Sequence, residues 1–258
     1  MPEPLAPNFI LLRGLTRESA HWGDFVPQLK AAFPNEKLAL LDLPGAGPFF
    51  RETSPCTISG ILEKVRAQAN ERGALAEPAT LIAVSLGGMV AWEWLLAYPE
   101  EIGGAVLINT SLGGLSPFYR RLRWQRYGTL FAAAGNRNIA AREPELLKLL
   151  SNREDNYRQT AANWVAIQKA RPVSAKNAFR QLVAAAAYQP KDIKPKPPVL
   201  LLNSLGDKLV DAACSEAIAQ KWQLELHTHP WGGHDLTVDD STWVVAEISN
   251  WIKKSRTT

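Results

Sequence analysis

The chain has 258 residues and a formal charge of +4, from 29 lysines and arginines against 25 aspartates and glutamates. That length suits one large α/β domain or two small ones, and it is enough to bury a sizeable core. Hydrophobic residues make up 46% of the chain and charged residues 21%, the balance of a folded globular protein, so a disordered chain is excluded. Two cysteines exclude a disulfide scaffold and are typical of a reducing compartment, and we therefore expect a cytoplasmic protein.

The first residues lack the features of a targeting segment. No basic region precedes the first apolar run, and that run stops at Arg13. Since a secretory signal needs a basic start followed by about 7 to 15 apolar residues, we expect none here. No stretch of the chain reaches the roughly 18 apolar residues of a membrane span, so we expect no membrane-spanning helix.

Short apolar runs predict the strands of a sheet. They are rich in Val, Ile and Leu without alternating polar residues, which is typical of strands buried on both faces of a parallel sheet. In chain order these runs are 9–12, 38–41, 80–84, 105–108, 199–202 and 224–226.

Helical patterns lie between these runs. Thr57 or Ser59 is a suitable N-cap for a helix that continues to about Arg72, where Gly73 supplies a stop. Near the end of the chain, apolar residues at helical spacing predict a closing helix: Val244, Ile248, Trp251 and Ile252. The alternation of strand and helix predicts an α/β fold with a mostly parallel, doubly wound sheet.

The alternation breaks between residues 112 and 198. This segment is rich in Ala, Arg, Asn and Leu, has the pattern of several helices, and is too long for a loop in a compact domain. We predict a helical cap at 112–198, inserted into a core domain made of 1–111 and 199–258. The cap segment carries 16 basic and 5 acidic residues, whereas the rest of the chain carries 13 and 20. The small net charge therefore hides two regions of opposite sign.

Ser85 is the strongest candidate for a nucleophile. A buried run leads directly into it and a helical pattern follows at once, so the serine must occupy a sharp turn that lifts its hydroxyl out of the sheet. Such a turn requires small residues two before and two after the serine, and Ala83 and Gly87 supply them. The alternative is structural: a serine that caps a helix, with glycines for packing.

A serine hydroxyl needs a neighbouring base, usually histidine. The chain has four histidines, of which His227 and His229 alternate along the last predicted strand and His21 lies in a polar loop. His234 follows a Gly-Gly pair just after that strand, where a loop can carry an imidazole over the sheet's edge. We predict that His234 is the base.

The base in turn needs an acid that orients it. Asp207 follows the strand at 199–202 and is our choice. Asp211 competes with it but is better placed to cap the next helix, and Asp42 is better placed to stabilise a turn before Pro44. The chain order Ser85, Asp207, His234 is that of an α/β-hydrolase.

Five segments, spread over almost the whole chain, make the sequence resemble the α/β-hydrolase superfamily, and in particular the small cofactor-free serine carboxylesterases of the pimeloyl-carrier methyl esterase type. They are 11–15, 42–47, 83–87, 206–210 and 233–236. The resemblance implies a Ser-His-Asp mechanism in which the backbone N–H groups of Leu15 and Leu86 form the oxyanion hole. It is specific for the reaction class and leaves esterase, thioesterase and lactonase open.

Arg13 departs from the family pattern, which commonly has histidine there. Its side chain either packs and pairs locally or recognises an anionic group of the substrate. Trp22 and Trp231 are further candidates for substrate binding, although tryptophans in such a fold are more often part of the core.

Other chemistries fit less well. Ser85 argues against the dehalogenases and epoxide hydrolases of this fold, which use an aspartate nucleophile. Cys56 and Cys214 are isolated and lack zinc spacing, and the segment 45–47 lacks the remaining features of a dinucleotide loop. We therefore expect no metal and no cofactor.

The expected ligand is a small-molecule ester, and nucleic-acid binding is not expected because the basic segment shows no recognised module. A rival within the hydrolases acts on an acyl chain borne by an acidic carrier protein, which the arginines of the cap segment would attract; a solvated basic face is the simpler interpretation. These arginines are Arg120, Arg121, Arg123, Arg126, Arg137, Arg142, Arg153 and Arg158. From another class, a non-catalytic hydrolase-like binding protein is the less favoured alternative.

Overall fold

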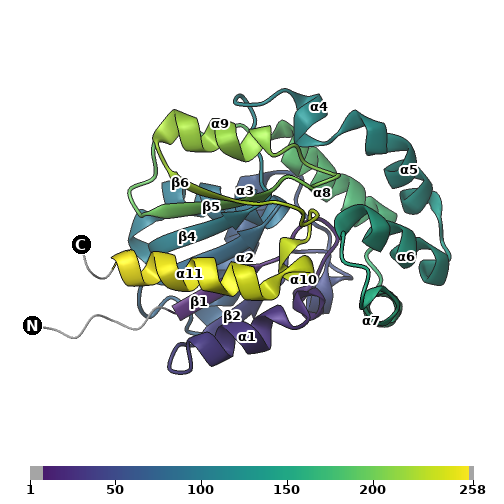
Figure 1. Ribbon diagram of the computed structural model, residues 1–258, viewed down its shortest axis with the longest axis horizontal. Helices are drawn as coiled ribbons and strands as arrows, with labels where there is room; N and C mark the ends of the chain where they lie inside the picture. Colours follow the sequence, from purple (N-terminus) through teal and green to yellow (C-terminus); the bar gives the residue numbers. More distant parts are fainter. Residues whose placement is uncertain (1–7, 256–258) are drawn as a thin grey trace, which may run out of the picture.

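The computed structural model describes residues 8–255, apart from the side chains of residues 131, 134 and 255. Residues 1–7, on which the prediction about a targeting segment largely depends, lie outside the described residues. Within that range the chain forms one six-stranded sheet in the order β2-β1-β3-β4-β5-β6, and every neighbouring pair is parallel. The predicted α/β class with a parallel sheet is therefore confirmed (Figure 1).

All six predicted strands are present. Their bounds are β1 Asn8–Leu12, β2 Leu38–Leu41, β3 Ala79–Val84, β4 Ile102–Ile108, β5 Val199–Ser204 and β6 Glu225–His229. Every residue of β3 and β5 is buried, which explains why these segments read as continuous apolar runs. β6 extends three residues beyond its apolar run and ends at His229, because its polar residues also pair with β5.

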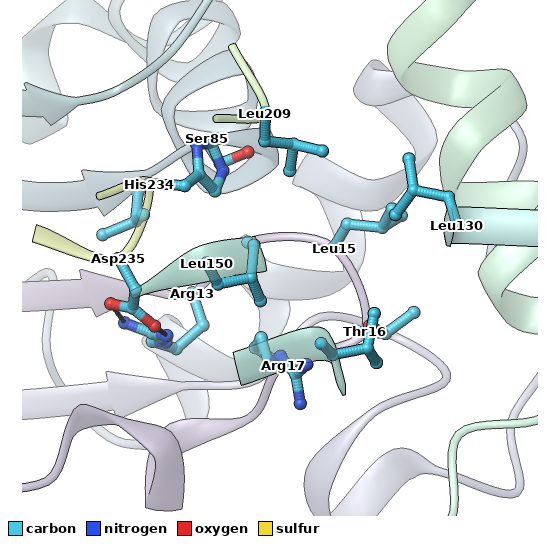
Figure 2. Close-up of a pocket in the computed structure, with 13 residues that line it drawn as sticks. Arg13, Leu15, Thr16, Arg17, Ser85, Leu130, Leu150, Leu209, His234 and Asp235 are labelled. Atoms are coloured by element: carbon cyan, nitrogen blue, oxygen red, sulfur yellow. Dashed lines mark hydrogen bonds and ion pairs between the residues drawn. The ribbon is translucent and has the colours of Figure 1, made fainter. Parts of the chain in front are cut away.

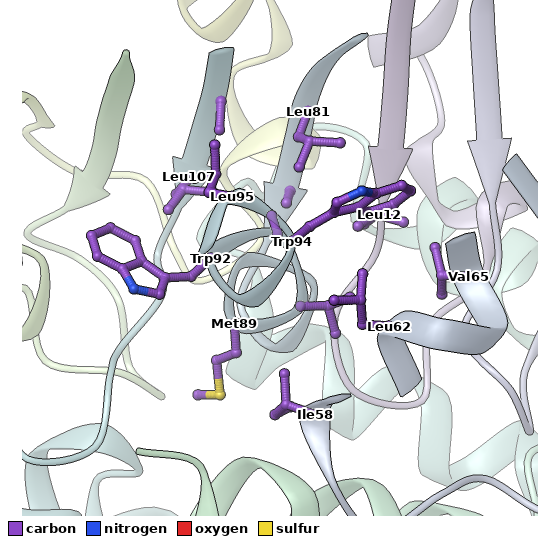
Figure 3. Packing of buried hydrophobic residues seen from close by; sticks show 14 of the residues in the cluster. Leu12, Ile58, Leu62, Val65, Leu81, Met89, Trp92, Trp94, Leu95 and Leu107 are labelled. Atoms are coloured by element: carbon purple, nitrogen blue, oxygen red, sulfur yellow. The ribbon is translucent and has the colours of Figure 1, made fainter. Parts of the chain in front are cut away.

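Helices cover both faces of the sheet. On one face α2 (Ile58–Glu71), α3 (Leu86–Ala97) and α9 (Ala213–Trp222) bury their apolar residues against every second strand residue, such as Leu81 and Leu107. Figure 3 shows Trp92 and Trp94 of α3 within this layer. On the other face α1 (Phe25–Ala32) and α11 (Ser241–Ser255) pack against the alternate strand residues, such as Ile82 and Val106. Burial of both faces is the main stabilising contribution.

The predicted helix boundaries have clear local causes. The hydroxyl of Thr57 accepts a hydrogen bond from the N–H of Gly60 at 3.2 Å, so Thr57 rather than Ser59 is the N-cap of α2. The helix ends at Glu71, and Gly73 adopts a φ of 64°.

The segment between β4 and β5, all of which is described, contains helices and no strand. It consists of α4 Phe118–Arg121, α5 Tyr127–Gly135, α6 Ile139–Leu150, α7 Tyr157–Ala170 and α8 Ala175–Ala187. Within this set α5 contacts α6 and α8, and α6 contacts α7, while α4 contacts α9 (Ala213–Trp222). The helices gather at one end of the sheet (Figure 1). The short helix α10 Leu236–Asp239 precedes α11. Across residues 8–255, no helix combines the length and apolar character that crossing a membrane requires.

Candidate active site

Ser85 occupies a turn between the end of β3 and the start of α3. Its φ of 56° and ψ of −117° lie in a region that non-glycine residues rarely adopt, and such strain concentrates at functional sites. The turn is held by a hydrogen bond from the Ser85 N–H to the carbonyl of Ile108 (2.9 Å) and by one from the Thr110 hydroxyl to the Ser85 carbonyl (2.8 Å). The sharp strand–helix turn predicted from the sequence is therefore present.

Gly87 allows this turn to pack against the end of β1. A Cβ atom at position 87 would lie 2.6 Å from the carbonyl oxygen of Leu12 and 2.7 Å from that of Arg13. Both obstacles are backbone atoms, so they cannot rotate away. Glycine is required here because α3 crosses directly over the main chain of another strand's end.

His234 and Asp207 are in direct contact. His234 Nδ1 lies 2.7 Å from Asp207 Oδ2, and both side chains are buried. The other carboxylate oxygen, Oδ1, accepts hydrogen bonds from the N–H groups of Leu209 (2.7 Å) and Val210 (2.9 Å). The loop after β5 therefore fixes the carboxylate, and the carboxylate in turn fixes the plane and position of the imidazole.

Asn109, at the end of β4, positions the histidine loop and was not anticipated. Its Nδ2 donates to the carbonyls of Gly233 (3.1 Å) and His234 (3.0 Å). Its φ of 46° is a conformation that residues other than glycine rarely adopt. The sequence offered a weak signal, since a polar residue directly follows a buried run, as Asp207 follows β5.

Ser85 and His234 face the same small pocket, whose volume is about 60 Å³ (Figure 2). Leucine is the most frequent residue in the pocket lining, contributed both by the residues around the sheet and by the segment between β4 and β5. It consists of Arg13, Gly14, Leu15, Thr16, Arg17, Val84, Ser85, Leu130, Leu146, Leu150, Leu209, His234 and Asp235. The pocket thus combines a hydroxyl, an imidazole and an apolar wall, which suits the acyl group of an uncharged substrate.

The residues predicted for the oxyanion hole are both close to Ser85 in the structure. Leu86 is the first residue of α3, where backbone N–H groups have no partner within the helix and the helix dipole favours an anion. Leu15 lines the pocket in a loop that approaches Ser85 closely, since a Cβ on Gly14 would lie 3.1 Å from the Ser85 Cβ. The roles of the two amides stay predictions.

Arg13 is engaged by the protein itself. Its Nη2 forms an ion pair with Asp235 Oδ2, its Nη1 donates to Asp235 Oδ1 at 3.0 Å and to the Thr237 hydroxyl at 3.2 Å, and its guanidinium carbon lies 4.7 Å above the Trp22 ring. Figure 2 shows the two charged groups facing each other. This arrangement favours the local pairing considered for Arg13 over recognition of an anionic substrate.

The two tryptophans considered for substrate binding do not line the pocket. Trp22 is buried, with 1% of its surface exposed, beneath the Arg13 guanidinium. Trp231 is 45% exposed and borders a separate, polar hollow beside Asp24 and Asp240. The reason is that each ring packs against a neighbouring side chain, Trp22 on Phe25 and Trp231 on His229.

Burial and neighbouring charge change two ionisable groups near the site. His21 lies in a short 3₁₀ helix and is buried rather than in a solvated loop; burial, followed by Arg17 and Arg13, holds the pKa of its imidazole well below the ordinary value. Burial alone would raise the pKa of Asp235, but the charge and hydrogen bonds of Arg13 outweigh it, and the pKa is lower than usual. Asp235 is therefore a carboxylate at neutral pH.

The other predicted alternatives lie elsewhere. His227 and His229 are on β6 and contact Glu247 and Asp240. Asp42 accepts hydrogen bonds from the N–H and hydroxyl of Ser19. Across residues 8–255, no group of three or more His, Cys, Asp or Glu side chains is arranged to hold a metal ion.

Comparison with known proteins identifies the family of the chain. Residues 9–247 match the model of the alpha/beta hydrolase family. A pimeloyl-[acyl-carrier protein] methyl ester esterase of Edwardsiella ictaluri is 28% identical over 71% of this chain, and the match spans 60% of that protein. The enzyme of the same name in Xylella fastidiosa is 25% identical over 95% of both chains.

Solved structures share the fold. An esterase from Rhodococcus superimposes on 96% of this chain and 90% of its own with a TM-score of 0.77, at 19% identity. The match to the family model covers nearly the whole chain, including Ser85, Asp207 and His234. The chain therefore belongs to the alpha/beta hydrolase family.

Proposed function

We propose that this chain hydrolyses carboxylic esters through an acyl-enzyme formed on Ser85, with His234 as general base and Asp207 as its orienting acid. The observation that carries the proposal is that Ser85, on its strained turn, shares a pocket with an imidazole whose Nδ1 is held by a fixed carboxylate. The chain is a carboxylic ester hydrolase, as its family and the esterases among its relatives support.

The reaction follows from the arrangement. His234 Nε2 takes the proton as the Ser85 hydroxyl attacks the ester carbonyl, and the oxygen that becomes negative is received by the amides of Leu15 and Leu86. The alcohol leaves with the proton from His234. Water, deprotonated by the same imidazole, then attacks the acyl group, and Ser85 is regenerated with release of the carboxylic acid.

We propose that residues 112–198 act as a cap over a core of 1–111 and 199–258. Support comes from Leu130 of α5 and from Leu146 and Leu150 of α6, which line the same pocket as Ser85. In this arrangement the cap excludes water from the acyl-enzyme and sets the length of acyl group that the pocket accepts.

Substitution of Ser85 by alanine tests the mechanism. Loss of the nucleophile is expected to reduce turnover of p-nitrophenyl acetate about 10⁴-fold or more, because the residual rate comes from binding and the oxyanion donors alone. Circular dichroism and urea unfolding should show an unchanged fold.

The matched control is Ser59→Ala, at an exposed serine of α2, which should keep full activity. Labelling by a fluorophosphonate probe should likewise disappear in Ser85→Ala and persist in Ser59→Ala. Full turnover by Ser85→Ala would rule the mechanism out, whereas the absence of turnover and of probe labelling in the unaltered chain would favour a non-catalytic binding protein.

A second candidate substrate is an acyl ester borne by an acidic carrier protein. The relatives in Edwardsiella and Xylella are named for such a substrate, and the proposed cap carries the basic excess of the chain. Four of its arginines are engaged with neighbours: Arg121 with Ala185, Arg123 with Asp211, Arg142 with Glu143 and Arg153 with Asp155. Arg120, Arg137 and Arg158 are exposed and are the residues most available to a carrier.

A further inference from the structure

The loop that carries Leu15 is tied to the helices between β4 and β5 by two ion pairs. Arg17 Nη1 donates to Glu143 Oε2 of α6 at 2.7 Å, and the two side chains are only 5% and 1% exposed. Next to it, Glu18 accepts from Arg171, which follows α7, with Nε at 2.9 and 3.0 Å from the two carboxylate oxygens. The loop is thus fastened to parts of the chain more than 120 residues away.

The main chain of the same loop is also held. Thr16 donates its N–H to Oε1 of Gln181 in α8 at 3.0 Å and accepts at its carbonyl from Nε2 of Gln168 in α7 at 3.3 Å. Thr16 has a φ of 58°, which is strained for a residue other than glycine, and these two hydrogen bonds hold it in that conformation. Three helices, α6, α7 and α8, therefore determine where the residues directly after Leu15 lie.

The Arg17 guanidinium is buried at considerable cost. Its carbon lies 4.3 Å above the Trp164 ring and its Nη1 lies 3.4 Å from His21 Nε2, while Nε has no hydrogen-bond partner among the described residues. Of the contacts to this guanidinium, only that with Glu143 brings a compensating negative charge. A buried pair of this kind seldom adds stability over an apolar pair, but its direction is specific, which suits a positioning role.

We propose that Arg17 and Glu143 are positioning residues that hold the Leu15 amide in oxyanion-binding geometry, an inference that rests on the proposed function. An oxyanion donor must lie about 2.7 to 3.1 Å from the developing negative charge, so a shift of even 1 Å in the loop removes its effect. Figure 2 shows Leu15, Thr16 and Arg17 following one another along the loop that borders the pocket, with Leu15 on the side of Leu130 of α5. The cap helix α6 thereby belongs to the apparatus that stabilises the transition state.

The decisive variant is the double substitution Arg17→Met with Glu143→Leu. It replaces the buried ion pair by apolar side chains of similar size. Glu143 also pairs with Arg142 (Nε to Oε1, 2.9 Å), whose side chain is 17% exposed and keeps contact with water when the carboxylate is removed, so the protein is expected to remain folded with a somewhat lower Tm. If the pair positions Leu15, kcat for p-nitrophenyl acetate falls about 10- to 100-fold while KM changes less than about twofold. If the pair only stabilises the fold, kcat stays at its original value.

A second readout separates positioning from pocket shape. A trifluoromethyl ketone forms an adduct with Ser85 that carries an oxyanion, so its affinity should fall by the same factor as kcat. The affinity of the corresponding alcohol, which carries no such charge, should not change. Equal loss of affinity for both compounds would overturn the proposal.

The matched control lies on the same helix. Glu145 of α6 pairs with Lys148 at 2.7 Å, but both side chains are more than half exposed, and Glu145→Gln should leave kcat unchanged. Should the double variant fail to fold, Glu143→Gln decides: it keeps an acceptor of the same size without the charge, and a milder fall in kcat, about 3- to 10-fold, is expected. An unchanged kcat in Glu143→Gln would refute the positioning role while leaving the Ser85 mechanism intact.

Discussion

A buried imidazole surrounded by guanidinium groups is unusual, and His21 is such a residue. Its pKa is held well below the ordinary value by burial first, then by the charges of Arg17 and Arg13, with a smaller contribution from Arg171. The ring is kept in place because its Nδ1 lies 3.1 Å from the N–H of Glu18 and its face meets the edge of Trp164. His21 therefore stays neutral in the folded chain over a pH range in which it is protonated in the unfolded chain.

The neutral state of His21 makes stability depend on pH. The unfolded imidazole has a pKa near 6.5, so below that pH the unfolded state binds a proton that the folded state rejects, and the free energy of unfolding falls by up to about 1.4 kcal/mol per pH unit. Substitution His21→Asn, which keeps an acceptor for Glu18, should make urea unfolding between pH 7.5 and 5.5 less dependent on pH. The same slope in both proteins would contradict this role of His21.

At the same scale, Arg13 and Asp235 join two loops of the site. Asp235 directly follows His234, and Arg13 lies two residues before Leu15, so their ion pair links the loop of the proposed base to the loop of the proposed oxyanion donor. Removal of either partner would leave a charge buried without compensation, which typically costs about 3 to 5 kcal/mol. The ion pair with Asp235 therefore explains how an arginine is accommodated at position 13, where the family commonly has histidine.

Two helices decide the size of the pocket. Leu130 of α5 and Leu146 and Leu150 of α6 line it together with Leu15 and Leu209. Leu146 and Leu150 are one helical turn apart and both line the pocket. Leu147 packs against Ala161 and Trp164 of α7, and Leu150 also contacts this cluster. Leu146 therefore faces the pocket and Leu147 faces the neighbouring helix, with Leu150 in contact with both.

Widening this wall should change the preferred acyl length. Leu146→Ala is expected to move the optimum of kcat/KM among p-nitrophenyl esters from the shortest chains toward longer ones, by about fourfold in kcat/KM for each added methylene that the new space buries. Leu147→Ala is the matched control: it should lower the free energy of unfolding, by about 2 to 5 kcal/mol, without moving the optimum. A shift in Leu147→Ala, or none in Leu146→Ala, would contradict the assignment of the two faces.

Over the whole molecule, charge is divided between two regions. Residues 112–198 hold 16 basic and 5 acidic residues, and the rest of the chain is acidic in balance. The proposed catalytic residues Ser85, Asp207 and His234 all belong to the acidic part, so none of them lies in the basic region. That region is the part of the molecule suited to attract an acidic partner over a distance.

Salt and charge reversal test this larger-scale role. If an acidic carrier delivers the acyl ester, kcat/KM for the carrier-bound substrate should fall steeply between low and physiological salt, and Arg120→Glu with Arg137→Glu should reduce it roughly tenfold. Hydrolysis of p-nitrophenyl acetate should be unaffected. Reversal of Lys37 and Lys64, both exposed outside residues 112–198, changes the net charge equally and should have little effect. A rate independent of salt would exclude the carrier.

The strands, the sheet class and the serine turn could be predicted because each depends on a few adjacent residues. The apolar runs at 80–84 and 199–202 are buried on both faces, and Gly87 is the residue that the crossing of α3 over β1 requires. The contact of His234 with Asp207 could also be predicted, since parallel strands bring their carboxyl ends to one edge of the sheet.

Other features of the site depend on residues that meet only after folding. The residues next to Arg13 and Arg17 in the chain do not indicate their partners. Arg13 pairs with Asp235, 222 residues away, and Arg17 pairs with Glu143, 126 residues away. The burial of Trp22, the exposure of Trp231 and the leucine wall from α5 and α6 likewise follow from packing between distant segments. The sequence by itself determined the family and the order of the proposed catalytic residues, because local periodicity and turn stereochemistry encode them. The tertiary structure alone decided which charges are paired and how large the pocket is, since burial sets the cost of a charge and only the packed helices set that burial.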